Sequence, residues 1–195
     1  NRIVGNIFIG RFLGVEPLAG FTVANTLVLI IIAFVMLMGS GSSALISILL
    51  GQKKPEEATR TLDNALVVSA LFSLPLMAAG LFLTEPLLRL FGGDGASLVH
   101  GASFLRVFAL GTFFQFANTV LNSAIRAEGQ PMKALMTNIV SFAGTTVLTP
   151  VFLLLFPLGI AGVGVAMVVS QFLVMLWLGG HFLGKATALR LRRTS

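Results

Sequence analysis

The sequence predicts an all-α integral membrane protein, and three observations carry this prediction. Of the 195 residues, 56% are hydrophobic and only 10% are charged, whereas soluble domains carry about 25% charged residues. Several long stretches contain no charge at all, and backbone groups in lipid must find their hydrogen bonds inside a helix or a closed barrel. The cations gather in alternate connections between these stretches, as the connections of a multi-pass protein do.

The first predicted helix is incomplete. Residues 1–13 are mostly apolar, are too few to cross a bilayer and begin without methionine, so we expect a first helix truncated upstream. A loop is expected from Gly10 to Gly20. The charge-free run from Pro17 to Gln52 predicts a helix over about 20–50. At about 1.5 Å per residue this run would extend roughly 54 Å, beyond a hydrocarbon core of about 30 Å. We therefore expect part of it to be loop and the helix to project beyond the bilayer.

Turn and capping signals divide the rest of the chain into four more helices. Pro55 followed by two glutamates is typical of a helix start, because acidic side chains favour the first turn. Breaks are expected at Glu85-Pro86 with the following glycines, at Arg126–Pro131 and at Pro157–Gly159. The helices that follow from these signals run over about 56–84, 100–126, 131–156 and 160–188.

The distribution of cations predicts how the chain is oriented. One set of connections and the C-terminal tail hold Lys53, Lys54, Arg60, Arg126, Lys133, Lys185, Arg190, Arg192 and Arg193. The other set holds Arg11, Arg89 and Arg106. The positive-inside rule therefore places the first set, with the tail, in the cytoplasm. Because no single long basic tract exists, the lipid bilayer is an expected partner and nucleic acid is not.

The sequence offers no support for an enzyme or a metal protein. Cysteine is absent, and His100 and His181 lie far apart without ligand-like spacing, so no metal site and no cofactor are expected. No paired nucleophile and base is visible. Residues Gly39–Ala44 match a dinucleotide fingerprint, but they lie inside a predicted membrane helix, where small residues let helices approach closely.

Uncharged polar residues recur at helical spacing inside the predicted membrane helices, where they are costly and often functional. They are Gln115, Asn118 and Asn122 on one helix, Asn138, Thr145 and Thr149 on the next, and Gln171 on the last. Facing stripes of this kind can line a hydrated cavity, or they can simply hydrogen-bond helix to helix, and both interpretations stay open. Pro150, directly after the second stripe, is expected to bend its helix.

With its segments in this order, the chain resembles the N-terminal half of a bacterial MATE (multidrug and toxic compound extrusion) transporter. Any single segment is a weak match, but together they cover nearly the whole chain. The resemblance lies in Ile7–Gly14, Leu18–Gly20, Gly39–Ser47, Leu50–Gln52, Glu57-Ala58, Asn122–Gly129, Gly159–Ala166 and Ser170-Gln171.

The resemblance implies one six-helix bundle, residues 1–195, of a twelve-helix transporter whose second bundle is absent from this chain. Such a protein would lie in the bacterial cytoplasmic membrane. It would export organic cations or lipophilic drugs in exchange for entering H⁺ or Na⁺, and alternating access would come from one bundle rocking against the other.

Three positions depart from the pattern of the family. Gly5 stands where similar proteins carry an aspartate in the first helix, so the resemblance marks it as a cavity position that has lost its acid. Thr149 stands before Pro150 where an aspartate is usual, and a common hydroxyl residue is replaced near Met167. Asn122 keeps the amide of the family.

These departures leave alternatives open. Coupling can reside in the absent second half, or the protein can be a flippase-like exporter of a lipidic or neutral substrate without coupling in this half. A protein of a different class, a membrane scaffold that does not transport, is the other alternative.

Overall fold

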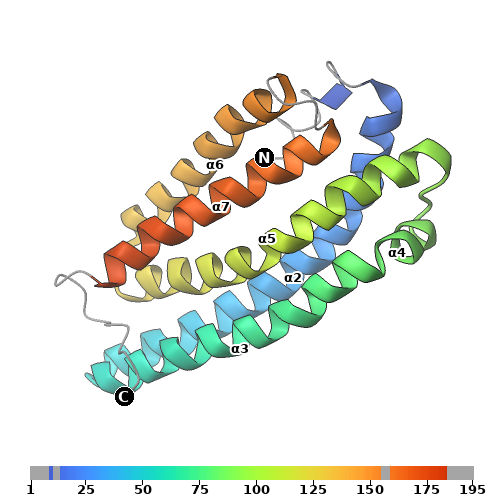
Figure 1. Cartoon of the computed structure of the whole chain (residues 1–195). Coiled ribbons are helices and arrows are strands. Elements are labelled where there is room, and N and C mark those ends of the chain that lie inside the picture. The colour runs from blue at the N-terminus through green and yellow to red at the C-terminus, as the bar shows by residue number, and fades with distance from the viewer. Residues whose placement is uncertain (1–8, 11–13, 155–158, 184–195) are drawn as a thin grey trace.

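A computed structural model describes residues 9–10, 14–154 and 159–183, and over these ranges the chain is a bundle of helices (Figure 1). The helices are α2 (Val15–Gly51), α3 (Pro55–Phe82), α4 (Thr84–Leu90), α5 (Gly95–Ala127), α6 (Pro131–Leu154) and α7 (Ile160–Leu183). All except α4 are long and apolar enough to cross a membrane. The prediction of an all-α membrane bundle is confirmed.

Two expectations for α2 are wrong, its start and the presence of loop in its charge-free run. Helix α2 begins at Val15, so the second half of the loop expected over 10–20 is helical. The charge-free run that starts at Pro17 is helical as far as Gly51, without the loop expected within it. Glu16 fits the first turn because its negative charge interacts favourably with the helix dipole. Pro17 fits there because the backbone N–H that proline lacks would have no partner within the helix. With 37 residues at 1.5 Å per residue, α2 is about 55 Å long, which exceeds the thickness of a bilayer.

The connection after α3 contains a short helix that the sequence does not predict. Helix α3 ends at Phe82, and α4 starts two residues later, so the expected break at Glu85-Pro86 falls inside α4. An ion pair of 3.0 Å between Glu85 and Arg106 ties α4 to α5. Next, Asp94 caps α5 with a capping box shared with Ser97, which explains why α5 starts at Gly95 and not near residue 100.

The later helices agree more closely with expectation. Helix α6 begins at Pro131 and continues as helix through Pro150, and the expected bend at this proline stays a prediction. Helix α7 begins at Ile160. The expected ends near 156 and 188, like most of the first helix with Gly5 and the basic tail, lie outside the described residues.

Helix α5 forms the centre of the bundle and packs against α2, α3, α6 and α7. At one end of the bundle, Phe21 of α2 meets Phe104 of α5 edge to face, with ring centroids 4.8 Å apart. Near the other end, Gly39 of α2 lies against Thr119 and the Ser43 hydroxyl donates to the Ser123 carbonyl. Gly39 and Ser43 therefore serve close packing, as expected, whereas a methyl group at Gly41 would meet no atom within 4 Å.

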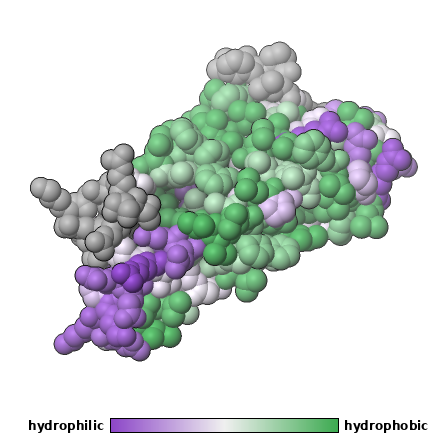
Figure 2. Space-filling model, turned by 60° about the horizontal axis from the view of Figure 1, so that its bottom comes forward, coloured by the Kyte–Doolittle hydropathy of each residue, from purple (hydrophilic) through white to green (hydrophobic). Residues whose placement is uncertain are grey.

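Figure 2 shows a broad hydrophobic surface between two hydrophilic ends. We call the end that carries the α2–α3 and α5–α6 turns the basic end. It holds Lys53, Lys54, Arg60, Arg126 and Lys133. The apolar band between the two ends is the surface that faces lipid in a membrane protein.

Candidate functional site

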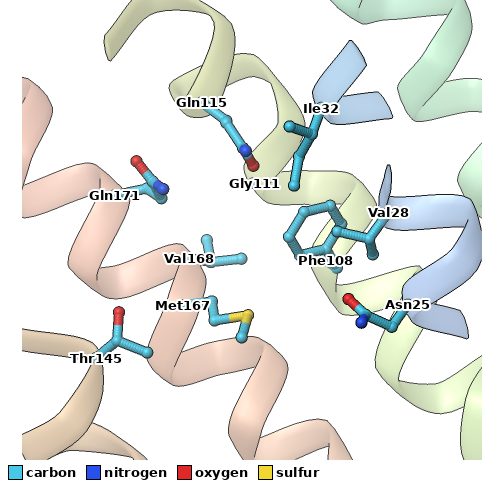
Figure 3. A pocket seen from close by; sticks show the side chains of 10 residues that line it. All are labelled: Asn25, Val28, Ile32, Phe108, Gly111, Gln115, Thr145, Met167, Val168 and Gln171. Carbon is cyan, nitrogen blue, oxygen red and sulfur yellow. The ribbon is translucent and has the colours of Figure 1, made fainter. Parts of the chain in front are cut away.

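Side chains from four helices enclose a cavity of about 100 Å³, which we call the central cavity. Figure 3 shows residues of α2 and α5 on one side of it and residues of α6 and α7 on the other. Its lining residues are Asn25, Val28, Ile32, Phe108, Gly111, Gln115, Thr145, Met167, Val168 and Gln171. Amides and a hydroxyl here stand among apolar side chains, so the wall can accept ligands of mixed polarity.

A second cavity, of about 170 Å³, lies next to the first on the side of the basic end, and we call it the inner cavity. Its lining residues are Met36, Gln115, Asn118, Thr119, Asn122, Arg126, Thr137, Asn138, Ser141, Gln171 and Val174. Because Gln115 and Gln171 line both cavities, the two are neighbours that share a wall. Together they form a polar path from the interior of the bundle toward Arg126.

Hydrogen bonds hold part of this polar path in place. The Nδ2 of Asn118 donates to the Gln171 carbonyl at 2.8 Å and to Gln171 Oε1 at 2.7 Å, which joins α5 to α7. The Nδ2 of Asn122 donates to the Ala134 carbonyl at 3.0 Å, which joins α5 to α6. These amides therefore bond helix to helix and also line a cavity, and the hydration of that cavity stays a prediction.

The two threonines of α6 differ in position. Thr145 lines the central cavity, whereas Thr149 is buried and lines neither cavity. Each hydroxyl donates to the carbonyl four residues earlier, at 2.9 Å from Thr145 and 2.6 Å from Thr149. Asn138 is exposed and lines the inner cavity at its edge. Thus the structure places six of the eight expected site residues at the two cavities, and Gly5 lies outside the described ranges.

The sequence alone missed several lining residues. Asn25 lies three residues before Val28 and seven before Ile32, so the three residues share one face of their helix. However, Asn25 is a single amide in a long apolar run, and the sequence showed no second amide on that face to mark it as a site. Arg126 belongs to the cytoplasmic cations and to the segment Asn122–Gly129 that carries the resemblance, but the sequence alone did not mark it as a site residue. Nothing acidic lines the central or the inner cavity within the described ranges. In the same ranges, no cluster of three side chains suited to a metal ion is present.

The amide bridge between α5 and α7 makes a testable prediction. Replacing Asn118 with leucine removes both bonds to Gln171, so we expect the free energy of unfolding to fall by about 1 kcal/mol. In a Gln171→Leu background the same change should cost about half as much, because the side-chain bond is already lost. Equilibrium unfolding in mixed micelles measures the change in free energy of unfolding in both backgrounds. Asn138→Leu is the matched control, since Asn138 is exposed, and a loss there equal to that of Asn118→Leu would contradict the bridge.

Comparisons with known proteins agree with this architecture. The MatE family model matches residues 2–152. "Probable multidrug resistance protein YoeA" of Bacillus subtilis (strain 168) is 31% identical over 182 residues, which are 90% of this chain and 39% of that protein. "Probable multidrug resistance protein YpnP" of the same organism is 26% identical over 176 residues, 90% of this chain and 40% of that protein. The chain thus spans about 40% of the length of these relatives.

Solved structures share the fold. A MOP superfamily transporter from Pyrococcus furiosus, described as having a binding pocket of reversed polarity, superposes with a TM-score of 0.92 at 23% identity and covers 98% of this chain and 42% of that one. A MATE protein in the bent conformation gives a TM-score of 0.92 at 24% identity over 99% of this chain and 44% of that one. Because the family model covers most of its length and the same bundle recurs in these structures, the chain belongs to the MatE family.

Proposed function

We propose that this bundle, together with a second one, forms an exporter that carries small organic cations or lipophilic drugs across the membrane by alternating access. The observation that carries the proposal is the pair of adjoining cavities with Gln115 and Gln171 in their shared wall. Amides in that wall offer hydrogen bonds, while Phe108 and Met167 offer apolar and polarisable contact. The names of the relatives as multidrug resistance proteins support the same activity.

The size of the cavities supports a site shared between two bundles. At about 100 and 170 Å³, each is smaller than the 300–1,000 Å³ or so of pockets for drug-sized ligands. A second bundle placed against α2 and α6 would supply the rest of the wall. The partner of this chain in transport is then the second bundle of the same protein.

Coupling to H⁺ or Na⁺ entry is the mechanism that the family resemblance implies, and we propose that its acidic groups lie outside the described cavities. The uncharged lining within the described ranges also supports a second candidate, an exporter of a neutral or lipidic substrate that needs no acid in this bundle. The concentration of cations at the basic end supports a cytoplasmic location for that end.

Efflux from cells tests the proposal. Bacteria lacking their own drug exporters, and expressing the complete protein that contains this bundle, should lose preloaded ethidium faster than cells with empty vector. Collapse of the proton gradient, or removal of sodium, should abolish the difference if the respective ion drives export.

Normal expression without any difference for ethidium would count against the cation exporter. If a fluorescent neutral lipid analogue then crossed the membrane faster than in control cells, the second candidate would hold. Failure with both substrate types would instead favour the scaffold that does not transport.

A further inference from the structure

A separate groove opens at the basic end, where the end of α5, the start of α6 and the end of α7 meet. It has a volume of about 440 Å³ and contains none of the residues of the central or inner cavity. Its residues come from the end of α5, the first turns of α6 and the last turns of α7. The groove is lined by Ile125, Lys133, Met136, Leu176, Trp177, Leu178 and Gly180.

The groove combines one cation with apolar walls open to the membrane. Leu176, Trp177 and Met136 are exposed by 57%, 48% and 47%, so their apolar surface faces the surroundings of the bundle. Lys133 is exposed as well and stands at the charged end of these walls. Tryptophan is enriched where lipid headgroups meet hydrocarbon, and lysine reaches toward the headgroups from the same depth.

The position of Lys133 in α6 indicates that its ammonium group interacts with a group outside this helix. It is the third residue of α6, where the helix dipole disfavours a cation. Within the described ranges no acidic side chain forms an ion pair with it. An anion bound beside Lys133 would interact favourably with both the ammonium group and the amino-terminal end of α6.

From these observations we infer that the groove between α6 and α7 at the basic end binds one anionic phospholipid. The phosphate lies beside Lys133 and the start of α6, and the acyl chains run along Met136, Leu176 and Trp177. A free phosphate would leave the apolar walls uncovered, and a purely apolar occupant would leave the cation unpaired. Basic pockets between membrane helices on the cytoplasmic side have the properties that anionic headgroups recognise. This inference does not depend on the proposed transport activity.

The composition of the chain makes a direct test possible. It contains one tryptophan and no tyrosine, so its intrinsic fluorescence comes almost entirely from Trp177. The chain is reconstituted in bilayers of phosphatidylcholine with a rising fraction of brominated phosphatidylglycerol, and separately of brominated phosphatidylcholine. Bromine on an acyl chain quenches tryptophan on contact. We expect half-maximal quenching at about a fivefold lower fraction of the anionic lipid, the ratio that one nearby lysine supplies.

Two variants separate the site from general attraction to a charged surface. Lys133→Gln should remove the preference and leave quenching by the two lipids equal. Lys53→Gln, the matched control, removes the same charge from the α2–α3 turn at the same end and should keep the preference. Equal quenching by both lipids in the unmodified chain, or equal loss in both variants, would overturn the inference. So would fluorescence that no brominated lipid quenches, because another protein segment would then cover the groove.

Discussion

Replacing Gly20 with alanine is expected to lower the free energy of unfolding by about 2 kcal/mol, because α2 and α5 touch backbone to backbone at this point. A methyl group at position 20 would stand 2.5 Å from the Ser97 carbonyl oxygen and 2.8 Å from the Gly101 nitrogen. Both atoms belong to the backbone of α5, so neither can turn away as a side chain would. Relief requires the two helices to separate, and the packing of Phe21 on Phe104 would weaken with them.

The higher helix propensity of alanine opposes the destabilisation by this clash, but its contribution is smaller. Alanine favours a helix over glycine by about 1 kcal/mol, and the clash has to exceed this gain for the variant to be destabilised. Gly41→Ala in the same helix separates the two contributions, because a methyl group there meets no atom within 4 Å. We expect this control to unfold at the same or a slightly higher denaturant concentration in mixed micelles. If Gly20→Ala behaved like Gly41→Ala, the close approach of α2 and α5 would be wrong.

The number and type of the membrane helices could be predicted from sequence because one physical requirement dominates. A long uncharged stretch in lipid has to satisfy its backbone internally, and five such stretches became five helices. Where they begin was harder to predict, because bilayer thickness sets a minimum length and no maximum. Helix α2 therefore starts at Val15, earlier than the thickness argument suggests. Helix α4 has only seven residues, which are too few for a periodic pattern to show.

The candidate site was partly predictable for a related reason. Spacing along one helix fixes which residues share a face, and Gln115, Asn118 and Asn122 of α5 do line the inner cavity. The rotation and tilt of one helix against another depend on packing at many contacts, which spacing does not encode. For this reason the sequence alone could not bring Asn25 of α2 opposite Gln171 of α7.

A lysine in place of Gln115 is expected to weaken the export of organic cations about thirtyfold while sparing neutral substrates, if the proposed transport path is correct. Gln115 belongs to the wall shared by both cavities, so a charge at its tip would act on any ligand passing between them. Two like charges about 8 Å apart at an effective dielectric constant of about 20 repel each other by about 2 kcal/mol, a factor of roughly thirty in affinity.

The lysine variant changes both the charge and the shape of the side chain at position 115. The matched control Gln115→Met changes the shape without adding a charge. Methionine is unbranched like lysine and fills the same part of the wall without a charge, so export of ethidium should stay within a fewfold of the unmodified protein. The concentration of ethidium giving half-maximal efflux should rise about thirtyfold for the lysine variant alone. Equal losses in both variants would mean that Gln115 acts through its amide or its shape. No loss in either would place the transport path away from the two cavities, because a cation cannot pass a fixed like charge at this distance without a measurable cost.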